Sequence, residues 1–299
     1  MKINSLEDLP GLKKGVKLAP YTTWKIGGPA TFFWEPTIEF LEPAITYCKR
    51  NKIKVYYLGR GSNVLINDKG LDGLVICTKR VLQNIEFKDQ VVEAESGVPM
   101  PKLSKMVARR GYGGYEFLIG IPGSVGAGVA INAGLTAKKR LEVKDYLIDA
   151  DILDEKGKFR TVSKDDLEMR YRGSAALDQR WYIIKARFRL DELSTPEEIN
   201  SKTVEHLRDR KRKQPLSKAT AGSTFKQPEG GKAAGWYIDH AGLKGLQVGD
   251  AKVSEKHANW IENTGNASSE DVKNLMEIIV SKVQKEFSVV LEHEVSFFN

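Results

Sequence analysis

The chain has few of the features that define several common protein classes. Its 299 residues include two cysteines, Cys48 and Cys77, and neither belongs to a C-x-x-C motif. We therefore expect reduced, structural thiols and no disulfide framework. No apolar run approaches the length of a membrane span, and residues 1–15 contain no stretch typical of a signal peptide. These absences predict a cytoplasmic protein with no membrane partner.

The sequence also lacks two common nucleotide-binding motifs and any pair of histidines spaced to bind a metal ion. The pattern G-x-G-x-x-G occurs nowhere, and the glycine-rich segment 120–134 lacks the Lys and Ser/Thr that complete a P-loop. The histidines are widely spaced, and none pairs with another at metal-ligand spacing, so we predict no metal site. They are His206, His240, His257 and His293.

Positive charge is in excess, with 47 Lys+Arg against 39 Asp+Glu and a net charge of +8. This balance favours anionic partners without choosing among nucleic acids, nucleotides and sugar phosphates. The densest basic cluster, residues 206–215, stops at Pro215 and has no interleaved aromatic residues. We therefore interpret it as a solvated helix end or a collar around an anionic small molecule, and predict no nucleic-acid partner.

The most informative segment present is GIPGSVGAGVAINAG at residues 120–134. Glycine lets the backbone approach another surface closely, and glycine-rich turns with free N–H groups bind phosphate oxygens. A glycine-rich packing seam or a set of tight turns would have the same sequence. GRGSN at residues 59–63 ends a predicted strand and is a second candidate phosphate loop, or else a strand-to-strand turn. Two such loops suit a dinucleotide whose pyrophosphate is held from opposite sides.

Strands and helices are mixed without a steady βαβ repeat, which predicts an α+β fold. Polar residues and a proline at 191–200 predict a domain boundary. A helix at 37–50 contains Pro43, which indicates a late start or a kink. Ser163 is expected to open a short helix through a capping box with Asp166. The other expected strands are 52–59, 63–66, 71–77, a hairpin with its turn at 88–89, a pair around 154–157, 181–190 and 287–298; the other expected helices are 101–111, one that enters the basic cluster, and 269–285.

Three polar residues are candidates for chemistry. Ser223 lies in AGSTFKQP, which lacks the G-x-S-x-G of a nucleophile elbow, so a turn serine is the alternative. Arg172 is either a surface arginine or a fixed cation that faces a carboxylate. Period two in the expected last strand places Glu292 and Glu294 on one face, and periodicity does not decide which of them enters a site.

Seven segments resemble, in the same order, the UDP-N-acetylenolpyruvoylglucosamine reductases, flavoenzymes of bacterial cell-wall precursor synthesis. Each alone is weak, but together they span nearly the whole chain. They are TTWKIGGPA (22–30), GRGSNVLIND (59–68), the glycine segment (120–134), YRGS (171–174), KQPLSKATAGSTFKQP (213–228), GLKGLQVGDAKVSEKHANWIEN (242–263) and LEHEV (291–295).

The resemblance implies FAD as cofactor, NADPH as hydride donor, and reduction of an enolpyruvyl ether on a UDP-sugar to the lactyl ether of UDP-N-acetylmuramate. It implies two FAD-binding subdomains of the vanillyl-alcohol-oxidase (PCMH) type, residues 1–80 and 81–195. An α+β substrate-binding domain would cover residues 196–299. We expect a monomer or a weak homo-oligomer.

The same resemblance implies residue roles. Ser223 is expected to donate a proton, and Arg172 and Glu294 to activate the substrate carboxylate. Glu294 is preferred to Glu292 because it directly precedes Val295. The residues expected to bind the UDP-sugar are Tyr171, Lys213 and Lys226; those expected to bind FAD are Gly59, Arg60, Gly61, Ser62, Asn63, Gly120, Gly123, Ser124, Val125 and Gly126.

Two departures from the family pattern matter. The family often continues its glycine segment as NAGAYG, whereas this chain reads NAGLTAKKRLEV, so contacts from that turn are in doubt. The spacing leaves no room for the tyrosine-bearing substrate loop of one subgroup, which predicts membership of the shorter subgroup. The alternatives are a non-catalytic FAD-binding paralogue and another PCMH-type flavin oxidoreductase.

Overall fold

The structure is a computed structural model that describes residues 2–136 and 140–299. Its backbone forms two compact units. Unit 1 comprises Met1–Lys14, Phe32–Arg60 and Gly73–Asp209, and unit 2 comprises Gly15–Thr31, Gly61–Asp72 and Arg210–Asn299. The three-domain division expected from the sequence stays a prediction.

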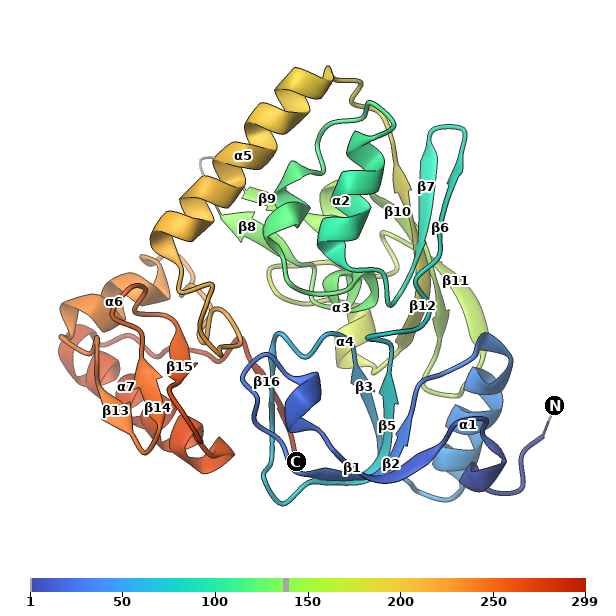
Figure 1. Cartoon of the computed structure of the whole chain (residues 1–299), viewed down its shortest axis with the longest axis horizontal. Helices are drawn as coiled ribbons and strands as arrows, with labels where there is room; N and C mark the ends of the chain where they lie inside the picture. Colours follow the sequence, from blue (N-terminus) through green and yellow to red (C-terminus); the bar gives the residue numbers. More distant parts are fainter. Residues whose placement is uncertain (1, 137–139) are drawn as a thin grey trace. The chain divides into compact units, whose positions relative to one another are not determined.

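Helices and strands follow one another along the chain as labelled in Figure 1. The α-helices are α1 (Ile38–Arg50), α2 (Met100–Ala108), α3 (Val125–Ala130), α4 (Ala175–Asp178), α5 (Pro196–Lys213), α6 (Ala234–His240) and α7 (Ser269–Phe287). The short 3-10 helices are η1 (Leu6–Asp8), η2 (Ala19–Tyr21), η3 (Glu116–Gly120) and η4 (Val143–Asp145). The strands are β1 (Lys13–Lys17), β2 (Pro29–Trp34), β3 (Val55–Leu58), β4 (Val64–Ile66), β5 (Leu71–Cys77), β6 (Ile85–Lys88), β7 (Val91–Glu95), β8 (Gly134–Thr136), β9 (Arg140–Glu142), β10 (Leu147–Leu153), β11 (Phe159–Ser163), β12 (Tyr182–Arg189), β13 (Gln247–Val248), β14 (Ala251–Val253), β15 (Ile261–Asn263) and β16 (Ser296–Phe298).

The main sheet of unit 1 is antiparallel, with strand order β11-β10-β12-β7-β6. Alternation along β7 buries Val92 and Ala94, and the register places Ala94 opposite Ala186 of β12. Helix α3 packs on β12 and β7, and its Val125 and Val129 join the same core. Burial of each such side chain contributes roughly 1.5–3 kcal/mol. The core therefore fixes the glycine segment against the sheet.

A second core of unit 1 lies between α1 and a parallel pair of strands. β3 and β5 are parallel, with Val55 opposite Leu74. Helix α1 buries one apolar face against this pair. Both cysteines are buried and free, and burial raises the pKa of Cys48 to about 12 and that of Cys77 to about 11. Thiols in that state are unreactive, which agrees with a structural role.

Unit 2 has a core built from three separate stretches of the chain. Trp24 and Leu65 pack with residues of α6, α7 and the sheet β13-β14-β15. Trp24 is fully buried, and its Nε1–H donates to the carbonyl of Ile261 at 2.8 Å. Helix α7 begins with a capping box in which Ser268 and Asp271 bond reciprocally. The motif at residues 22–30 is therefore part of the core of unit 2.

Elements with a strong sequence pattern are confirmed. Strand β5 spans the expected residues, and β6 and β7 form the expected hairpin, with Asp89 at a φ of +51° in its turn. Strands β10 and β11 pair around the turn at 154–157, and α7 buries the expected apolar stripe. Mixed helices and mainly antiparallel sheets confirm the α+β class.

The expected helix at 37–50 is confirmed as α1; its start at Ile38 excludes the late start, and the kink at Pro43 stays a prediction. Two other expectations about single elements are wrong. Ser163 and Asp166 do form reciprocal capping bonds, but they close a turn without a helix. The strand expected at 287–298 reduces to β16, because α7 extends to Phe287 and Ser288 turns into the left-handed region with a φ of +56°.

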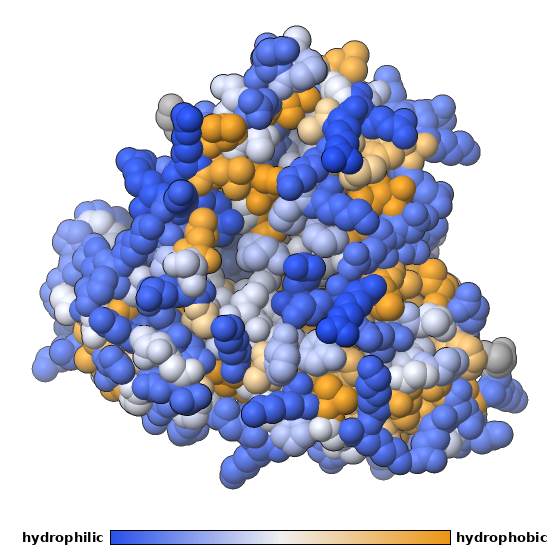
Figure 2. All heavy atoms as spheres, viewed as in Figure 1, coloured by the Kyte–Doolittle hydropathy of each residue, from blue (hydrophilic) through white to orange (hydrophobic). Residues whose placement is uncertain are grey.

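None of the helices in residues 2–136 and 140–299 is both long and apolar enough to cross a membrane. The face drawn in Figure 2 is mostly hydrophilic, with apolar residues in separate groups. Such scattered apolar exposure is ordinary for a folded domain and identifies no docking surface.

Candidate functional site

The predicted phosphate loop at residues 59–63 follows directly after β3. No backbone N–H group of this loop donates to a carbonyl of the described residues. Gly61 is buried with a φ of +64°, and a Cβ there would lie 2.2 Å from the carbonyl oxygen of Tyr21. Only glycine fits that position. Successive unpaired N–H groups around a left-handed residue form a concavity that suits an anion.

The second predicted phosphate loop meets the first at Gly59 and Ser124, both in unit 1. A Cβ on Gly59 would lie 2.6 Å from the Ser124 hydroxyl oxygen, so the two loops are in close contact. Ser124 is 1% exposed, and its hydroxyl has no hydrogen-bond partner among the described residues. Buried hydroxyls almost always have a partner. This unpaired group and the glycine cradle fit the phosphates of FAD.

Val125 and Gly126 of the glycine segment serve packing. The N–H of Val125 donates to Val98 at 2.8 Å, and the N–H of Gly126 donates to Ser96 at 2.9 Å. A Cβ on Gly126 would lie 2.7 Å from the Ser96 Cβ. The packing alternative therefore accounts for Gly126. Because both amides bind protein carbonyls, FAD contacts from Val125 and Gly126 would need other atoms.

Arg172 occupies a tight turn in unit 1. Arg170 and Gly173 exchange two backbone hydrogen bonds, which leaves Tyr171 and Arg172 at the tip. Arg172 has a φ of +55°, uncommon for a residue with a side chain. Its Nη2 donates to the Gly134 carbonyl at 3.3 Å. The guanidinium is thus held in a defined position, as a fixed cation requires.

The turn is fastened to the end of the glycine segment. The Asn132 side-chain amide donates to the Arg170 carbonyl at 3.1 Å, and the Ser174 hydroxyl donates to the Ala130 carbonyl at 2.7 Å. The ring of Tyr171 has the Arg172 guanidinium 5.1 Å and the Arg140 guanidinium 4.3 Å from its centre. Two cations beside one ring make this corner of unit 1 attractive to an anion.

Ser223 is half-buried in unit 2, in an extended segment whose next residues, Thr224 and Phe225, bond through their backbones. It forms an antiparallel bridge with Trp260. The N–H of Thr224 donates to the Asn259 carbonyl at 2.8 Å. The Asn259 side chain accepts from Phe225 N–H at 3.0 Å and donates to its carbonyl at 2.8 Å. The Ser223 hydroxyl is therefore carried by a well-fixed backbone.

Glu294 lies across the other edge of that segment. Its N–H donates to the Thr224 carbonyl at 2.9 Å, and Phe225 forms a bridge with His293. The Asn63 side chain donates to the Glu294 carbonyl at 3.0 Å. The structure therefore brings Ser223, Glu294 and Asn63 together within unit 2, and Asn63 supports Glu294 with its side chain.

The predicted lysines also lie in unit 2. Lys226 donates its backbone N–H to Glu292 at 2.8 Å, and its ammonium lies 3.4 Å from the Glu292 carboxylate. Glu292 is 75% exposed, so this pair is worth little energetically. Lys213 is the last residue of α5 and is exposed. Burial lowers the pKa of His257, and the charges of Lys244 and Lys213 act in the same direction.

The predicted residues thus form two groups. Unit 1 holds Arg172, Tyr171 and the Gly59–Ser124 contact, and unit 2 holds Ser223, Glu294 and the two lysines. Sequence reasoning missed Asn132 and Asn259, which hold these motifs in place. Both lie inside segments that resemble the family, and that position could have identified them, because an uncharged amide does not by itself indicate a functional role.

In the part of the chain that the structure describes, no group of three His, Cys, Asp or Glu could hold a metal. The altered turn after Gly134 includes residues 137–139, which lie outside the described residues.

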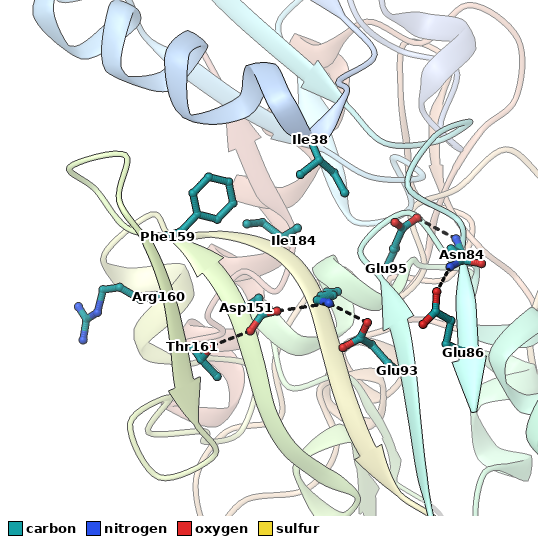
Figure 3. Close-up of a pocket in the computed structure, with 11 residues that line it drawn as sticks. Ile38, Asn84, Glu86, Glu93, Glu95, Asp151, Phe159, Arg160, Thr161 and Ile184 are labelled. Atoms are coloured by element: carbon teal, nitrogen blue, oxygen red, sulfur yellow. Dashed lines mark hydrogen bonds and ion pairs between the residues drawn. The ribbon is translucent and has the colours of Figure 1, made fainter. Parts of the chain in front are cut away.

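A cavity of about 480 Å³ lies elsewhere in unit 1 and does not contain any predicted site residue. It sits on the face of the main sheet opposite the core (Figure 3). Lys185 lies 2.7 Å from Glu93 and 3.6 Å from Asp151. Partial burial alone raises the pKa of Glu93, but hydrogen bonds from Lys185 and Arg187 lower it overall. These charges neutralise one another, so we interpret the charged residues that line the cavity as a structural ion network.

Comparison with known protein families agrees with this geometry. Residues 29–163 match a family model described as an FAD binding domain, and residues 214–298 match the C-terminal domain of UDP-N-acetylenolpyruvoylglucosamine reductase. The chain is therefore an FAD-dependent oxidoreductase. These matches confirm an FAD-binding module followed by a C-terminal α+β domain.

Close relatives define the family. The chain is 38% identical to the UDP-N-acetylenolpyruvoylglucosamine reductase of Synechococcus sp. (strain RCC307), over 95% of this chain and 93% of the relative. It is 40% identical to that of Agathobacter rectalis, over 97% and 95%. The crystal structure of the Thermus caldophilus enzyme superposes with a TM-score of 0.80 at 35% identity, over 95% of this chain and 98% of that one. The chain belongs to the UDP-N-acetylenolpyruvoylglucosamine reductase family, which confirms the resemblance.

Proposed function

We propose that the protein reduces the enolpyruvyl ether of UDP-N-acetylglucosamine enolpyruvate to the lactyl ether of UDP-N-acetylmuramate, with NADPH as hydride donor. The relatives carry the name of this reductase. The observation that carries the proposal is the backbone pairing of Thr224 with Glu294, because it joins the two segments that carry the proposed proton donor, Ser223, and the proposed carboxylate, Glu294. A cytoplasmic location and a monomeric or weakly associating state stay predictions.

The loop at 59–63 and Ser124 would hold the pyrophosphate of FAD. The unpaired N–H groups of the loop and the buried Ser124 hydroxyl supply the donors that phosphate oxygens require. When bound, FAD supplies hydride transfer from NADPH to the enolpyruvyl group.

Arg172 would stabilise the negative charge that develops on the substrate. Addition of hydride to the enol ether leaves charge that spreads into the neighbouring carboxylate. A guanidinium binds a carboxylate through two parallel hydrogen bonds, and it is most effective when it is already in place. The turn at Arg170–Gly173 and the bond to Gly134 provide that fixed position. Tyr171 would contact the substrate from the same turn.

Ser223 would donate the proton that completes the reduction. A serine hydroxyl is a very weak acid, but the carbon that it protonates is far more basic than water. Position then matters more than a matched pKa. The Asn259 bonds to Phe225 fix the backbone two residues away. We therefore assign proton transfer to a rigidly held hydroxyl.

Glu294 would act on the substrate carboxylate by donating a hydrogen bond in its protonated form. Lys213 and Lys226 would bind the UDP-sugar, because phosphates attract ammonium groups.

The test is to mix the FAD-containing protein with NADPH and UDP-N-acetylglucosamine enolpyruvate and follow NADPH absorbance. We expect oxidation that depends on the enolpyruvyl sugar. A protein that carries FAD but oxidises NADPH no faster with this sugar than without it would rule out the reductase assignment, and would favour a non-catalytic paralogue or another flavin oxidoreductase.

Ser223→Ala separates the two half-reactions. NADPH should still bleach the flavin at the wild-type rate, while reoxidation by the enolpyruvyl sugar should slow by at least a hundredfold, as expected for loss of general acid catalysis. Ser217→Ala, at an exposed serine of the same unit, is the matched control and should change neither step. Normal reoxidation in Ser223→Ala would show that Ser223 is not the acid.

A further inference from the structure

Trp260 and Ser223 face each other across an antiparallel bridge in unit 2. The hydrogen bond from Thr224 N–H to the Asn259 carbonyl flanks this pair, which makes Ser223 and Trp260 a non-hydrogen-bonded pair. In such pairs both side chains project from the same face, and their Cβ atoms are about 4.5–5.5 Å apart. The side chains of Trp260 and Ser223 are therefore neighbours on one face of this strand pair.

The indole N–H of Trp260 lacks a hydrogen-bond partner. Trp260 is 5% exposed, and its Nε1 bonds to no acceptor among the described residues. An indole N–H can only donate, and buried donors without an acceptor are rare. Three of the other four tryptophans have a bonded indole: Trp24 donates to the Ile261 carbonyl at 2.8 Å, Trp34 to the Pro10 carbonyl at 2.9 Å, and Trp181 to the Glu155 carboxylate at 3.1 Å.

We propose that Trp260 is a substrate-binding residue whose indole N–H donates to an oxygen of the enolpyruvyl group, next to the carbon that Ser223 protonates. The inference rests on the proposed function. A donor-only group beside the proton donor requires an acceptor, and the ether and carboxylate oxygens of the substrate are the acceptors adjoining that carbon. Trp260 would thereby hold the reacting carbon against the Ser223 hydroxyl.

Trp260→Phe tests this role, because it keeps an aromatic ring and removes the N–H. We expect KM for the enolpyruvyl sugar, and its Kd for the oxidised FAD enzyme by calorimetry, to rise about tenfold, the size of one lost hydrogen bond to a strongly polar acceptor. Flavin reduction by NADPH alone should be unchanged. Trp181→Phe is the control: it removes an indole N–H that already has a protein partner in unit 1, and it should leave both constants at the wild-type value.

Trp260→His is a second test, because it retains a ring N–H on a smaller side chain. Its Kd should lie between those of the wild type and Trp260→Phe. A Phe variant with wild-type KM and Kd, or a His variant that binds no better than the Phe variant, would overturn the assignment while the reductase function stood. A wild-type protein that does not use the enolpyruvyl sugar would instead defeat the proposed function itself.

Discussion

Asn259→Ala is expected to be the most informative substitution in unit 2. The side chain is 7% exposed and bonds both the N–H and the carbonyl of Phe225, at 3.0 and 2.8 Å. Alanine removes both bonds at once. Because Phe225 is 1% exposed, its two backbone groups would be left buried without partners.

Each buried polar group left unpaired costs about 1–3 kcal/mol, so the two together cost roughly 2–6 kcal/mol. A water molecule entering the space of the lost amide can satisfy one group and reduce the sum. We therefore expect a loss of about 3 kcal/mol, a large fraction of the roughly 5–15 kcal/mol that stabilises a typical domain. The backbone that carries Ser223 should open locally as a result.

The assay is urea unfolding of the FAD-containing protein, with reoxidation of reduced flavin by the enolpyruvyl sugar measured in parallel. We expect a lower midpoint and slower reoxidation at an unchanged rate of flavin reduction. Asn51→Ala is the control, because the Asn51 amide makes one exposed bond to Tyr47 at 2.9 Å. If Asn259→Ala unfolded at the same urea concentration as Asn51→Ala and kept normal reoxidation, the reasoning would be refuted.

Two further predictions concern the glycine segment and a buried imidazole. Gly126→Ala should weaken FAD binding and cost about 1–3 kcal/mol, because its Cβ would meet the Ser96 Cβ at 2.7 Å. Gly128→Ala should cost less, because the atom its Cβ would overlap is the terminal methyl of the buried Met100, the far end of a flexible side chain that can shift; thermal unfolding and flavin content compare the two, and equal losses would contradict the packing argument. Burial lowers the pKa of His257, so the unfolded chain binds more protons between that pKa and about 6.5, and stability should fall as pH drops through this window. His257→Asn should flatten this part of the stability curve in urea unfolding at several pH values; an equally steep slope in both proteins would show that His257 is not responsible.

Sequence periodicity predicted elements well where the pattern was long and one-sided. The apolar stripe of α7, from Val272 to Val283, recurs over about three turns, so a helix was the best fit. The segment after α7 was wrongly predicted as a strand, because apolar and polar residues also alternate in irregular backbone. Leu291 and Val295 are buried while Glu292 is exposed, yet the backbone there is irregular. Only the tertiary contacts distinguish this segment from a β-strand.

The candidate site was predictable to the level of motifs but not to the level of atoms. The sequence predicted two candidate phosphate loops, and the structure puts Gly59 of one against Ser124 of the other. It could not show that the amides of Val125 and Gly126 are engaged by Val98 and Ser96, because those acceptors are set by how α3 docks on the sheet. Which donors stay available to a ligand is a property of the packed fold.

The side-chain amides of three asparagines hold the backbone of the predicted motifs in place. Asn132 bonds the Arg170 carbonyl below Arg172, Asn259 bonds both backbone groups of Phe225, and Asn63 bonds the Glu294 carbonyl. An amide both donates and accepts, so one short side chain can complete the hydrogen bonding of irregular backbone that no strand covers. Neither aspartate nor leucine can do this, since the first lacks the donor and the second lacks both groups. The proposed catalytic side chains depend on charge or a hydroxyl, whereas their positions depend on these neutral residues.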